Sequence, residues 1–406
     1  MSLKVISYAL IGAIVLILGV ATYRYATSPA RPLIFSPTQV LSSSWAMYKK
    51  LYVDPDTQRT IDRQRGGITT SEGQSYTMLR AVWQGDQPAF DASWQWTRER
   101  LARKDDHLFS WLWGEREDGT FGVLSEQGGH NSASDADTDI ALALVFAYAR
   151  WQDPAYLEAA RPIIRDIWDK EVVLVAGKPV LAANSVEKTA SSTFMVVNPS
   201  YLHPAAYHIF ASIDTGHPWE TLRSHAYALL RESAELALEG KESAGLPPDW
   251  VLINRSTGEM MAPAGGDQDT SFGYDALRVP FRIALDAAWF RNPDATALLK
   301  KFSFLSSEWE QDRKLATSYA HDGAPEVPSE SLAMYGGTLG YFLANDPEAA
   351  VHIYNEKMLP FYDAYTGGWS PQLSYYDDNW MWFGIALYNG QLRDLTAHLP
   401  STAFIE

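Results

Sequence analysis

The sequence predicts an all-α chain. Long amphipathic stretches run from Pro37 to the carboxyl end, broken by Gly, Pro and Asp, and runs of β-branched residues are few. Apolar residues that recur three and four positions apart are typical of helices that bury one face. Roughly 370 residues at about 30 per helix and connection give about twelve helices. With 46% hydrophobic residues, the chain can bury a large core.

The amino-terminal end predicts a membrane anchor. Residues 5–23 form an uncharged run of nineteen residues, about the length that spans a bilayer core and longer than the roughly 7 to 15 apolar residues of a secretory signal. A cleaved signal peptide is the alternative, because residues 26–28 form a small-residue site, although Pro29 directly after it disfavours cleavage. We therefore divide the chain into a transmembrane anchor or uncleaved signal at 1–25, a linker at 26–36 and a globular domain at 37–406.

Within the globular part the helical pattern is clearest in six stretches, and one short segment departs from it. The segment at 172–180, VVLVAGKPV, predicts a β-hairpin. No short repeat recurs, which disfavours a solenoid. We expect helices at Ala89–Leu101, Ala133–Trp151, Ala155–Trp168, Trp219–Leu238, Asp275–Trp289 and Asp346–Met358.

Composition excludes several classes of function. The net charge of -16 argues against a nucleic-acid partner, whose phosphates attract an excess of Lys and Arg. The absence of cysteine excludes disulfides, thiolate nucleophiles and Cys-based zinc sites. The motifs of common serine hydrolases, zinc proteases and nucleotide-binding loops are missing as well. The 15 Trp and 21 Tyr suit core packing first, and stacking on sugar rings second.

The stretch Ala133–Trp151, ASDADTDIALALVFAYARW, places three carboxylates at the start of a helix. Ser134 is a candidate N-cap, and Asp137 three residues later completes a variant of the capping box. On that interpretation Asp135 and Asp137 only satisfy first-turn amides and the helix dipole. A calcium loop is excluded, because its sixth position needs Gly and its twelfth Glu, whereas Ile140 and Phe146 stand there. We expect no metal and no cofactor.

A second candidate acid is Glu72 in the segment TTSEGQSYTML. Ser71 and Gln74 have capping-box spacing, which places Glu72 in the first turn of a helix. There the dipole favours the ionised form, so a general acid at this position would need burial or a neighbouring carboxylate to raise its pKa. A purely structural cap is the alternative.

The segment GGDQDTSFGYDALR at 265–278 is the other acidic cluster. Asp267 and Asp269 read as solvated loop residues. Asp275 differs, because Arg278 lies one helical turn on and can pair with it and keep it ionised.

Aromatic residues near these acids have structural and functional interpretations. Trp111 and Trp113 lie in FSWLWG, between two polar loops, and core packing is the default for Trp111. Tyr201 lies in NPSYLHPAAY, a proline-punctuated loop before a helix, and a single Tyr of this kind is most often packed. Near the carboxyl end, Tyr365 and Trp369 are candidates to line a cleft.

Taken together, these motifs resemble glycoside hydrolase family 8, the inverting cellulase-type enzymes. The resemblance is carried by Ala133–Trp151, by the S-E-G-Q segment around Glu72 and by Y-D-A-L-R at 274–278, and it extends over about 41–392. It implies an (α/α)6 barrel of six inner and six outer helices, with the cleft at one end of the inner ring. The implied roles are proton donor for Glu72, general base for Asp275, sugar binding and distortion for Asp135, and substrate contacts for Trp113, Tyr201 and Arg278.

The resemblance further implies an inverting endo-β-1,4-glucanase that hydrolyses a cellulose-like glucan. Combined with the predicted anchor, it suggests a catalytic domain on the extracytoplasmic side, in the periplasm or at the cell exterior, acting on a glucan that the cell exports. Its partners would be the β-linked polysaccharide, the membrane and an exopolysaccharide synthase or secretion complex. The alternatives are a chitosanase or xylanase of the same family, and a non-catalytic glycan-binding subunit of a secretion complex.

Overall fold

The computed structural model describes residues 36–265, 268–400 and 403–404. The predicted anchor at 1–25 and all of the predicted linker except Ser36 lie outside these residues. No helix within the described ranges is long and apolar enough to cross a membrane. The chain forms two compact units, 1–39 and 40–406. The second unit carries every candidate site residue.

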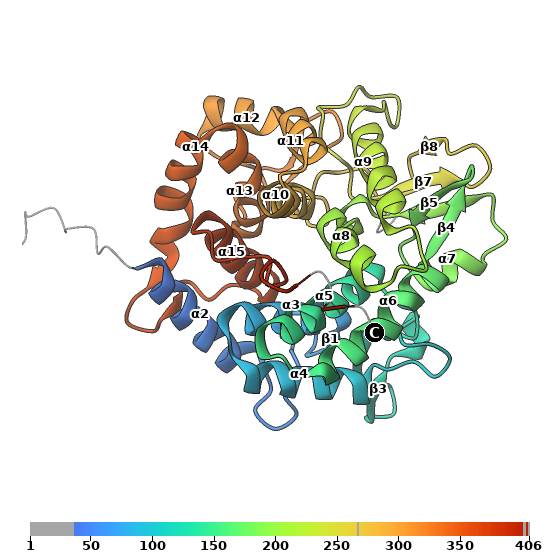
Figure 1. The fold of residues 1–406 in the computed structure, drawn as a ribbon. Coiled ribbons are helices and arrows are strands. Elements are labelled where there is room, and N and C mark those ends of the chain that lie inside the picture. The colour runs from blue at the N-terminus through green and yellow to red at the C-terminus, as the bar shows by residue number, and fades with distance from the viewer. Residues whose placement is uncertain (1–35, 266–267, 401–402, 405–406) are drawn as a thin grey trace, which may run out of the picture. The chain divides into compact units, whose positions relative to one another are not determined.

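Within its described residues, unit 40–406 is mostly helical, and its helices alternate between two environments (Figure 1). Helix α5 (Ser134–Trp151) is buried around almost its whole circumference, as expected of an inner helix. Helix α6 (Pro154–Glu171) buries one stripe, in which Tyr156, Ala160, Ile163 and Ile167 recur at helical spacing. The other inner helices are α3 (Ser71–Gln84), α8 (Pro204–Ile213), α10 (Arg278–Phe290), α13 (Leu332–Asn345) and α15 (Tyr375–Tyr388).

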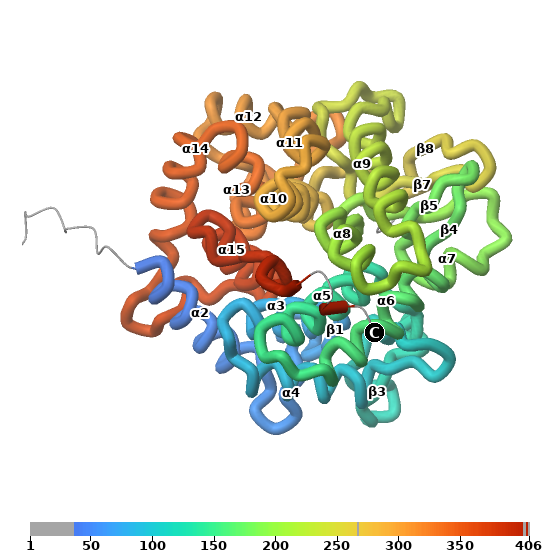
Figure 2. The backbone as a smooth tube through the Cα atoms, in the orientation of Figure 1, coloured from blue at the N-terminus to red at the C-terminus, as the bar shows by residue number. Residues whose placement is uncertain are grey.

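The inner helices contact one another in chain order, from α3 through α5, α8, α10 and α13 to α15. The buried ion pair between Arg80 and Asp378, 2.8 Å long, joins α15 back to α3 and closes the ring. The backbone trace in Figure 2 shows how these inner helices follow one another around the ring. The helices between them in sequence lie outside the ring, which is consistent with an (α/α)6 barrel. These outer helices are α2 (Pro37–Tyr52), α4 (Gln87–Arg100), α6, α9 (Trp219–Glu235), α11 (Pro293–Leu299), α12 (Phe304–Asp312) and α14 (Pro347–His352).

Short strands accompany the helices, so the predicted all-α class is corrected to mostly helical. The predicted hairpin is confirmed as β4 (Val172–Val175) paired with β5 (Lys178–Leu181). The sequence did not predict the remaining strands, because pieces of two to four residues are too short to show an alternating pattern. These strands are β1 (Thr69–Thr70), β2 (Leu112–Glu115), β3 (Phe121–Val123), β6 (Phe194–Val197), β7 (Val251–Asn254), β8 (Met260–Met261), β9 (Ser318–Tyr319), β10 (Pro325–Val327), β11 (Tyr362–Asp363) and β12 (Gly368–Trp369).

Five of the six predicted helices are found within a few residues of the expected bounds. The sixth, predicted to run continuously to Met358, is α-helical only to His352 and continues as a π-helix over Ile353–Met358. Helix α10 begins at Arg278 rather than at Asp275, so the candidate base lies in the preceding turn.

Candidate active site

Three carboxylates from distant segments meet at one guanidinium group. Arg278, the first residue of α10, is only 1% exposed. Its Nη1 atom donates to Glu72 Oε2 at 2.9 Å and to Asp135 Oδ2 at 3.0 Å. Its Nη2 atom donates to Asp275 Oδ1. One positive charge thus faces three acids, which favours retention of a proton on one of them.

Glu72 lies in the first turn of α3, with 23% of its side chain exposed. Burial raises the pKa of Glu72 to about 7, and the charge of Asp135 adds to the rise, while Arg278 opposes it. Tyr375, at the start of α15, donates its hydroxyl to Glu72 Oε1 at 2.7 Å. Glu72 can therefore hold a proton near neutral pH, which is the property a general acid needs.

The two predicted capping boxes are wrong. Thr70 caps α3 by accepting the N–H of Gly73 at 3.0 Å, and the Gln74 side chain instead bonds to groups in the core. Helix α5 has no side-chain cap, and Ser134 Oγ donates to a backbone carbonyl at 2.6 Å. Capping spacing is a local signal, whereas these side chains find partners from distant segments.

Asp275 is held in the turn that precedes α10, with 31% of its side chain exposed. The half-buried carboxylate of Asp249 accepts the N–H groups of Gly273 and Ala276, at 3.1 and 2.5 Å. These bonds fix the turn that carries Asp275. Burial raises the pKa of Asp275, while Arg278 opposes that shift. Sequence reasoning missed Asp249, because no local pattern signals a bond to residues 24 and 27 positions away.

Tyr201 joins the same cluster. It ends the 3-10 helix η2 (Pro199–Tyr201), and the guanidinium carbon of Arg278 lies 5.2 Å from its ring centroid. The ring packs edge-on against Trp250 at 5.8 Å. Burial and the charges of Asp135 and Asp275 raise the pKa of Tyr201 well above its usual range, so the hydroxyl stays protonated as a hydrogen-bond donor.

The structure does not bring Trp113 into this cluster. Its ring stacks on Phe121 at 5.4 Å with an interplanar angle of 29°. The Arg59 guanidinium carbon lies 4.8 Å from its centroid, and Trp96 contacts it edge-on at 5.3 Å. Trp113 is thus packed among side chains of the protein, and this packing provides no sugar-stacking position beside the acids.

The backbone of Trp111, a residue expected in the core, lies beside Ser71, the residue before Glu72. Its carbonyl accepts the N–H of Ser71, the residue before Glu72, at 3.0 Å. Its indole N–H donates to the Gly128 carbonyl at 3.0 Å, and the side chain is only half-buried. Sequence reasoning did not single out Trp111, because its place beside Ser71 depends on a backbone hydrogen bond between segments that lie far apart in the chain.

The three acids of α5 serve three purposes. Asp135 reaches Arg278. Asp139, one turn farther along α5, accepts hydrogen bonds from both Nη atoms of Arg282, at 2.9 Å each. Two Asp–Arg pairs therefore join α5 to α10. Asp137 accepts the backbone N–H of Phe109 at 3.0 Å. Among the described residues, no group of three or more His, Asp or Glu side chains is placed to hold a metal ion.

Asp137 also forms a buried acid pair with Glu171 at the end of α6. Glu171 Oε1 accepts the Ser132 hydroxyl at 2.6 Å. The other oxygen of each carboxyl is buried and has no donor among the described residues, so a proton shared between the acids satisfies both. Burial raises the pKa of Glu171 to about 8. Burial and the charge of Glu171 raise the pKa of Asp137 well above its usual range.

This acid pair makes the free energy of unfolding depend on pH. Glu171 ionises near pH 4.3 in the unfolded chain and at about 8 in the folded one. The folded state therefore binds the extra proton, and stability falls as pH rises from about 4 to about 8. We expect Glu171→Gln to lose less stability than the wild type between pH 5 and 8, measured by urea unfolding. Glu126→Gln, at an exposed acid, is the control, and equal losses in all three proteins would contradict the shared proton.

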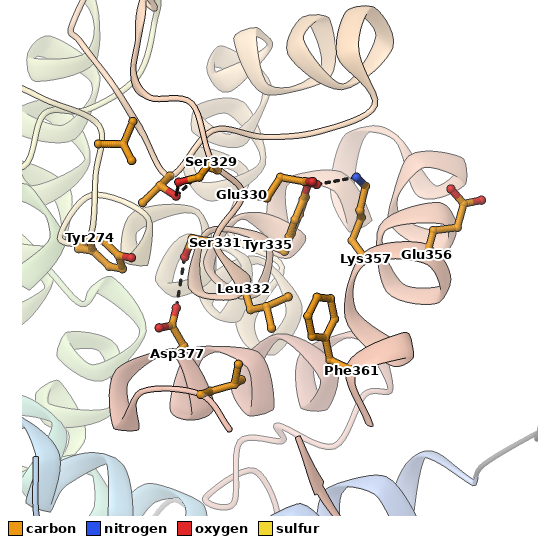
Figure 3. Close-up of a pocket in the computed structure, with 13 residues that line it drawn as sticks. Tyr274, Ser329, Glu330, Ser331, Leu332, Tyr335, Glu356, Lys357, Phe361 and Asp377 are labelled. Atoms are coloured by element: carbon orange, nitrogen blue, oxygen red, sulfur yellow. Dashed lines mark hydrogen bonds and ion pairs between the residues drawn. The ribbon is translucent and has the colours of Figure 1, made fainter. Parts of the chain in front are cut away.

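A cavity of about 640 Å³ opens at the same end of the inner ring (Figure 3). It begins at Tyr274, the neighbour of Asp275, and runs past the starts of α13 and α15. Ser331 donates to Asp377 at 3.2 Å there, and the pair of Glu330 and Lys357 lies farther along. None of the three acids that meet at Arg278 lines this recess, and Tyr274 connects it to them through its neighbour Asp275. Its lining of hydroxyls, carboxylates and aromatic rings suits a polyhydroxylated chain.

A helical ring whose inner helices present a proton-retaining Glu and a second carboxyl at one end has the parts of a glycoside hydrolase. The family model for glycosyl hydrolases family 8 matches residues 26–367, and the chain belongs to this family.

Individual relatives agree with this membership. The chain is 34% identical to an endoglucanase of Cellulomonas uda over 61% of this chain and 64% of that protein. It is 33% identical to an endoglucanase of Salmonella typhi over 58% and 60%. The chain thus spans somewhat less than two thirds of these two relatives. Among solved structures, an endo-1,4-D-glucanase of Vibrio fischeri ES114 superposes with a TM-score of 0.69 at 25% identity, covering 85% of this chain and 94% of that one.

Proposed function

We propose that this protein is an inverting endo-β-1,4-glucanase with an (α/α)6 barrel, acting on a cellulose-like glucan. The observation that carries the proposal is the convergence of Glu72, Asp135 and Asp275 on Arg278, with the pKa of Glu72 raised to about 7. Similarity to proteins named endoglucanases supports a β-1,4-glucan as substrate.

In this mechanism Glu72 protonates the oxygen of the leaving sugar. Asp275 takes a proton from a water molecule that attacks the opposite face of the ring, and the Tyr201 hydroxyl orients that water. Asp135 hydrogen-bonds to the sugar at the cleavage point and favours its distorted form. The half-buried Trp111, whose backbone lies beside the residue before Glu72, takes the sugar-stacking role that the resemblance assigned to Trp113.

The stereochemistry of the product tests the mechanism. A water molecule fits between base and sugar only if the acid and base carboxyls lie roughly 6.5 to 9.5 Å apart, and direct attack by water inverts the anomeric carbon. We expect proton NMR to show the α-anomer first when a β-1,4-glucan is hydrolysed, before mutarotation. Asp275→Asn should abolish this release. Initial appearance of the β-anomer would mean retention and would remove Asp275 as the water-activating base.

The cellular setting is a proposal from the sequence. The uncharged run at 5–23 supports a single membrane anchor, with the catalytic domain on the extracytoplasmic side acting on an exported glucan. We expect full-length protein in the membrane fraction after salt and alkaline washes. A soluble form that begins near Pro29 would refute the anchor and indicate a cleaved signal peptide.

A further inference from the structure

A second hollow, of about 600 Å³, lies between α4, the loop at 56–58 and the β2–β3 hairpin. Neither the three acids nor Arg278 lines it. Its volume falls within the range of roughly 300 to 1,000 Å³ that small-ligand sites occupy. The mechanism proposed above does not use this hollow.

An aromatic platform forms one side of the hollow. Phe121 is 55% exposed, although it is a large apolar side chain. It stacks on Trp113, and Trp113 is in turn held by Arg59 and by the edge of Trp96. Phe121 is thus the outermost ring of a braced stack. A rigid, solvent-facing ring of this kind binds the apolar face of a sugar without losing side-chain freedom.

Polar side chains surround the platform. Gln95 and Glu99 lie one turn apart on α4, and Gln95 Nε2 donates to Glu99 Oε1 at 2.9 Å. Arg100 and Gln58 complete the rim. Amide, carboxylate and guanidinium groups together offer donors and acceptors to hydroxyls. Because the lining also contains Asp56, it carries no excess of positive charge, which favours a neutral ligand over a phosphate.

The platform is connected to the acids by a short path along the β1–β2 pair. Trp113 pairs with Thr69 in this sheet. Two residues before Trp113, the Trp111 carbonyl accepts the N–H of Ser71, next to Glu72. Both strands therefore run from the braced stack to the start of α3.

We propose that this hollow is a second, non-catalytic binding site for β-glucan, with Phe121 as its stacking residue. The identity of the ligand rests on the proposed function. A polymer held here keeps its other segments at high effective concentration near the cleft, whereas an oligosaccharide too short to reach both sites gains nothing.

Binding is tested in proteins that carry Glu72→Gln, so that the glucan is not hydrolysed. Migration is compared in native gels with and without barley mixed-linkage β-glucan. We expect Phe121→Ala to weaken retardation by about three- to tenfold, as the loss of one aromatic contact implies, and Phe121→Tyr to retain it. Gln95→Ala should weaken it as well. Unchanged retardation of both Phe121→Ala and Gln95→Ala would overturn the site.

Kinetics with Glu72 intact separate this site from the cleft. Phe121→Ala should lower kcat/KM on mixed-linkage glucan and leave kcat/KM on cellopentaose unchanged, whereas equal losses on both would place Phe121 in the cleft and overturn the inference. If the wild type hydrolyses no glucan but its retardation depends on Phe121, the proposed function fails and the binding site stands. If hydrolysis occurs and retardation is independent of Phe121, the proposed function stands and the binding site fails. Circular dichroism of each variant confirms that it is folded.

Discussion

Replacing Glu72 by glutamine is expected to lower kcat on β-1,4-glucan by roughly 10²- to 10⁴-fold, the usual contribution of a general acid. Glutamine has nearly the same shape: its amide oxygen can still accept from Arg278, and its amide nitrogen can donate to the Tyr375 hydroxyl. Calorimetry should therefore show little change in the affinity for cello-oligosaccharides. Initial rates of reducing-sugar release measure the loss of turnover.

The dependence of kcat/KM on pH in the wild type tests the same role of Glu72 as proton donor. Because burial raises the pKa of Glu72 to about 7, the acid loses its proton as pH rises through about 7, and kcat/KM should fall on that side. The residual activity of Glu72→Gln should lack this fall. Glu126→Gln, at an exposed acid, should behave as the wild type. A Glu72→Gln enzyme that keeps more than a tenth of the wild-type kcat would move the proton donor elsewhere, with Asp135 the next candidate.

The second large effect is expected from Arg278→Met. Breaking a buried, hydrogen-bonded ion pair costs about 3 to 5 kcal/mol, and here one arginine serves three acids. Arg278 lowers the pKa of both Glu72 and Asp275. Without it both acids retain protons to higher pH, so Asp275 becomes an active base only at higher pH. Urea unfolding and pH–rate profiles measure the two effects.

The loss of stability in Arg278→Met should itself depend on pH. Removal of the guanidinium raises the folded-state pKa of Glu72 and Asp275 further. The deficit should therefore grow as pH rises through the wild-type folded-state pKa, which is about 7 for Glu72, and should be smaller below it. Arg278→Lys keeps the charge but not the planar fork, and we expect it to restore stability only in part.

Arg282→Met is the matched control for this effect. It breaks the second Asp–Arg pair between α5 and α10, through Asp139, and does not contact Glu72 or Asp275. We expect a comparable loss of stability with little shift of the pH–rate profile. If Arg278→Met and Arg282→Met shifted the profile equally, Arg278 would be a structural residue alone.

Several features could be predicted because their signals are local. The periodic apolar residues of α5 and α6 predicted helices close to the observed bounds. The apolar run around the Ala176–Gly177 turn predicted the β4–β5 hairpin. The motifs around Glu72, Asp135 and Asp275 predicted the acids that the structure brings together at Arg278. Each of these patterns lies within a short run of consecutive residues.

The sequence by itself therefore determined several of the helices, the resemblance to the family and the candidate acids, because periodicity and motif spacing are properties of neighbouring residues. The tertiary structure decided which partners those residues meet. Asp137 pairs with Glu171 rather than capping α5, and Asp249 holds the turn of Asp275. The backbone of Trp111 bonds to Ser71, the residue before Glu72. Such choices depend on contacts across the ring of helices, where burial and a charge from a distant segment set both the position and the pKa of each acid.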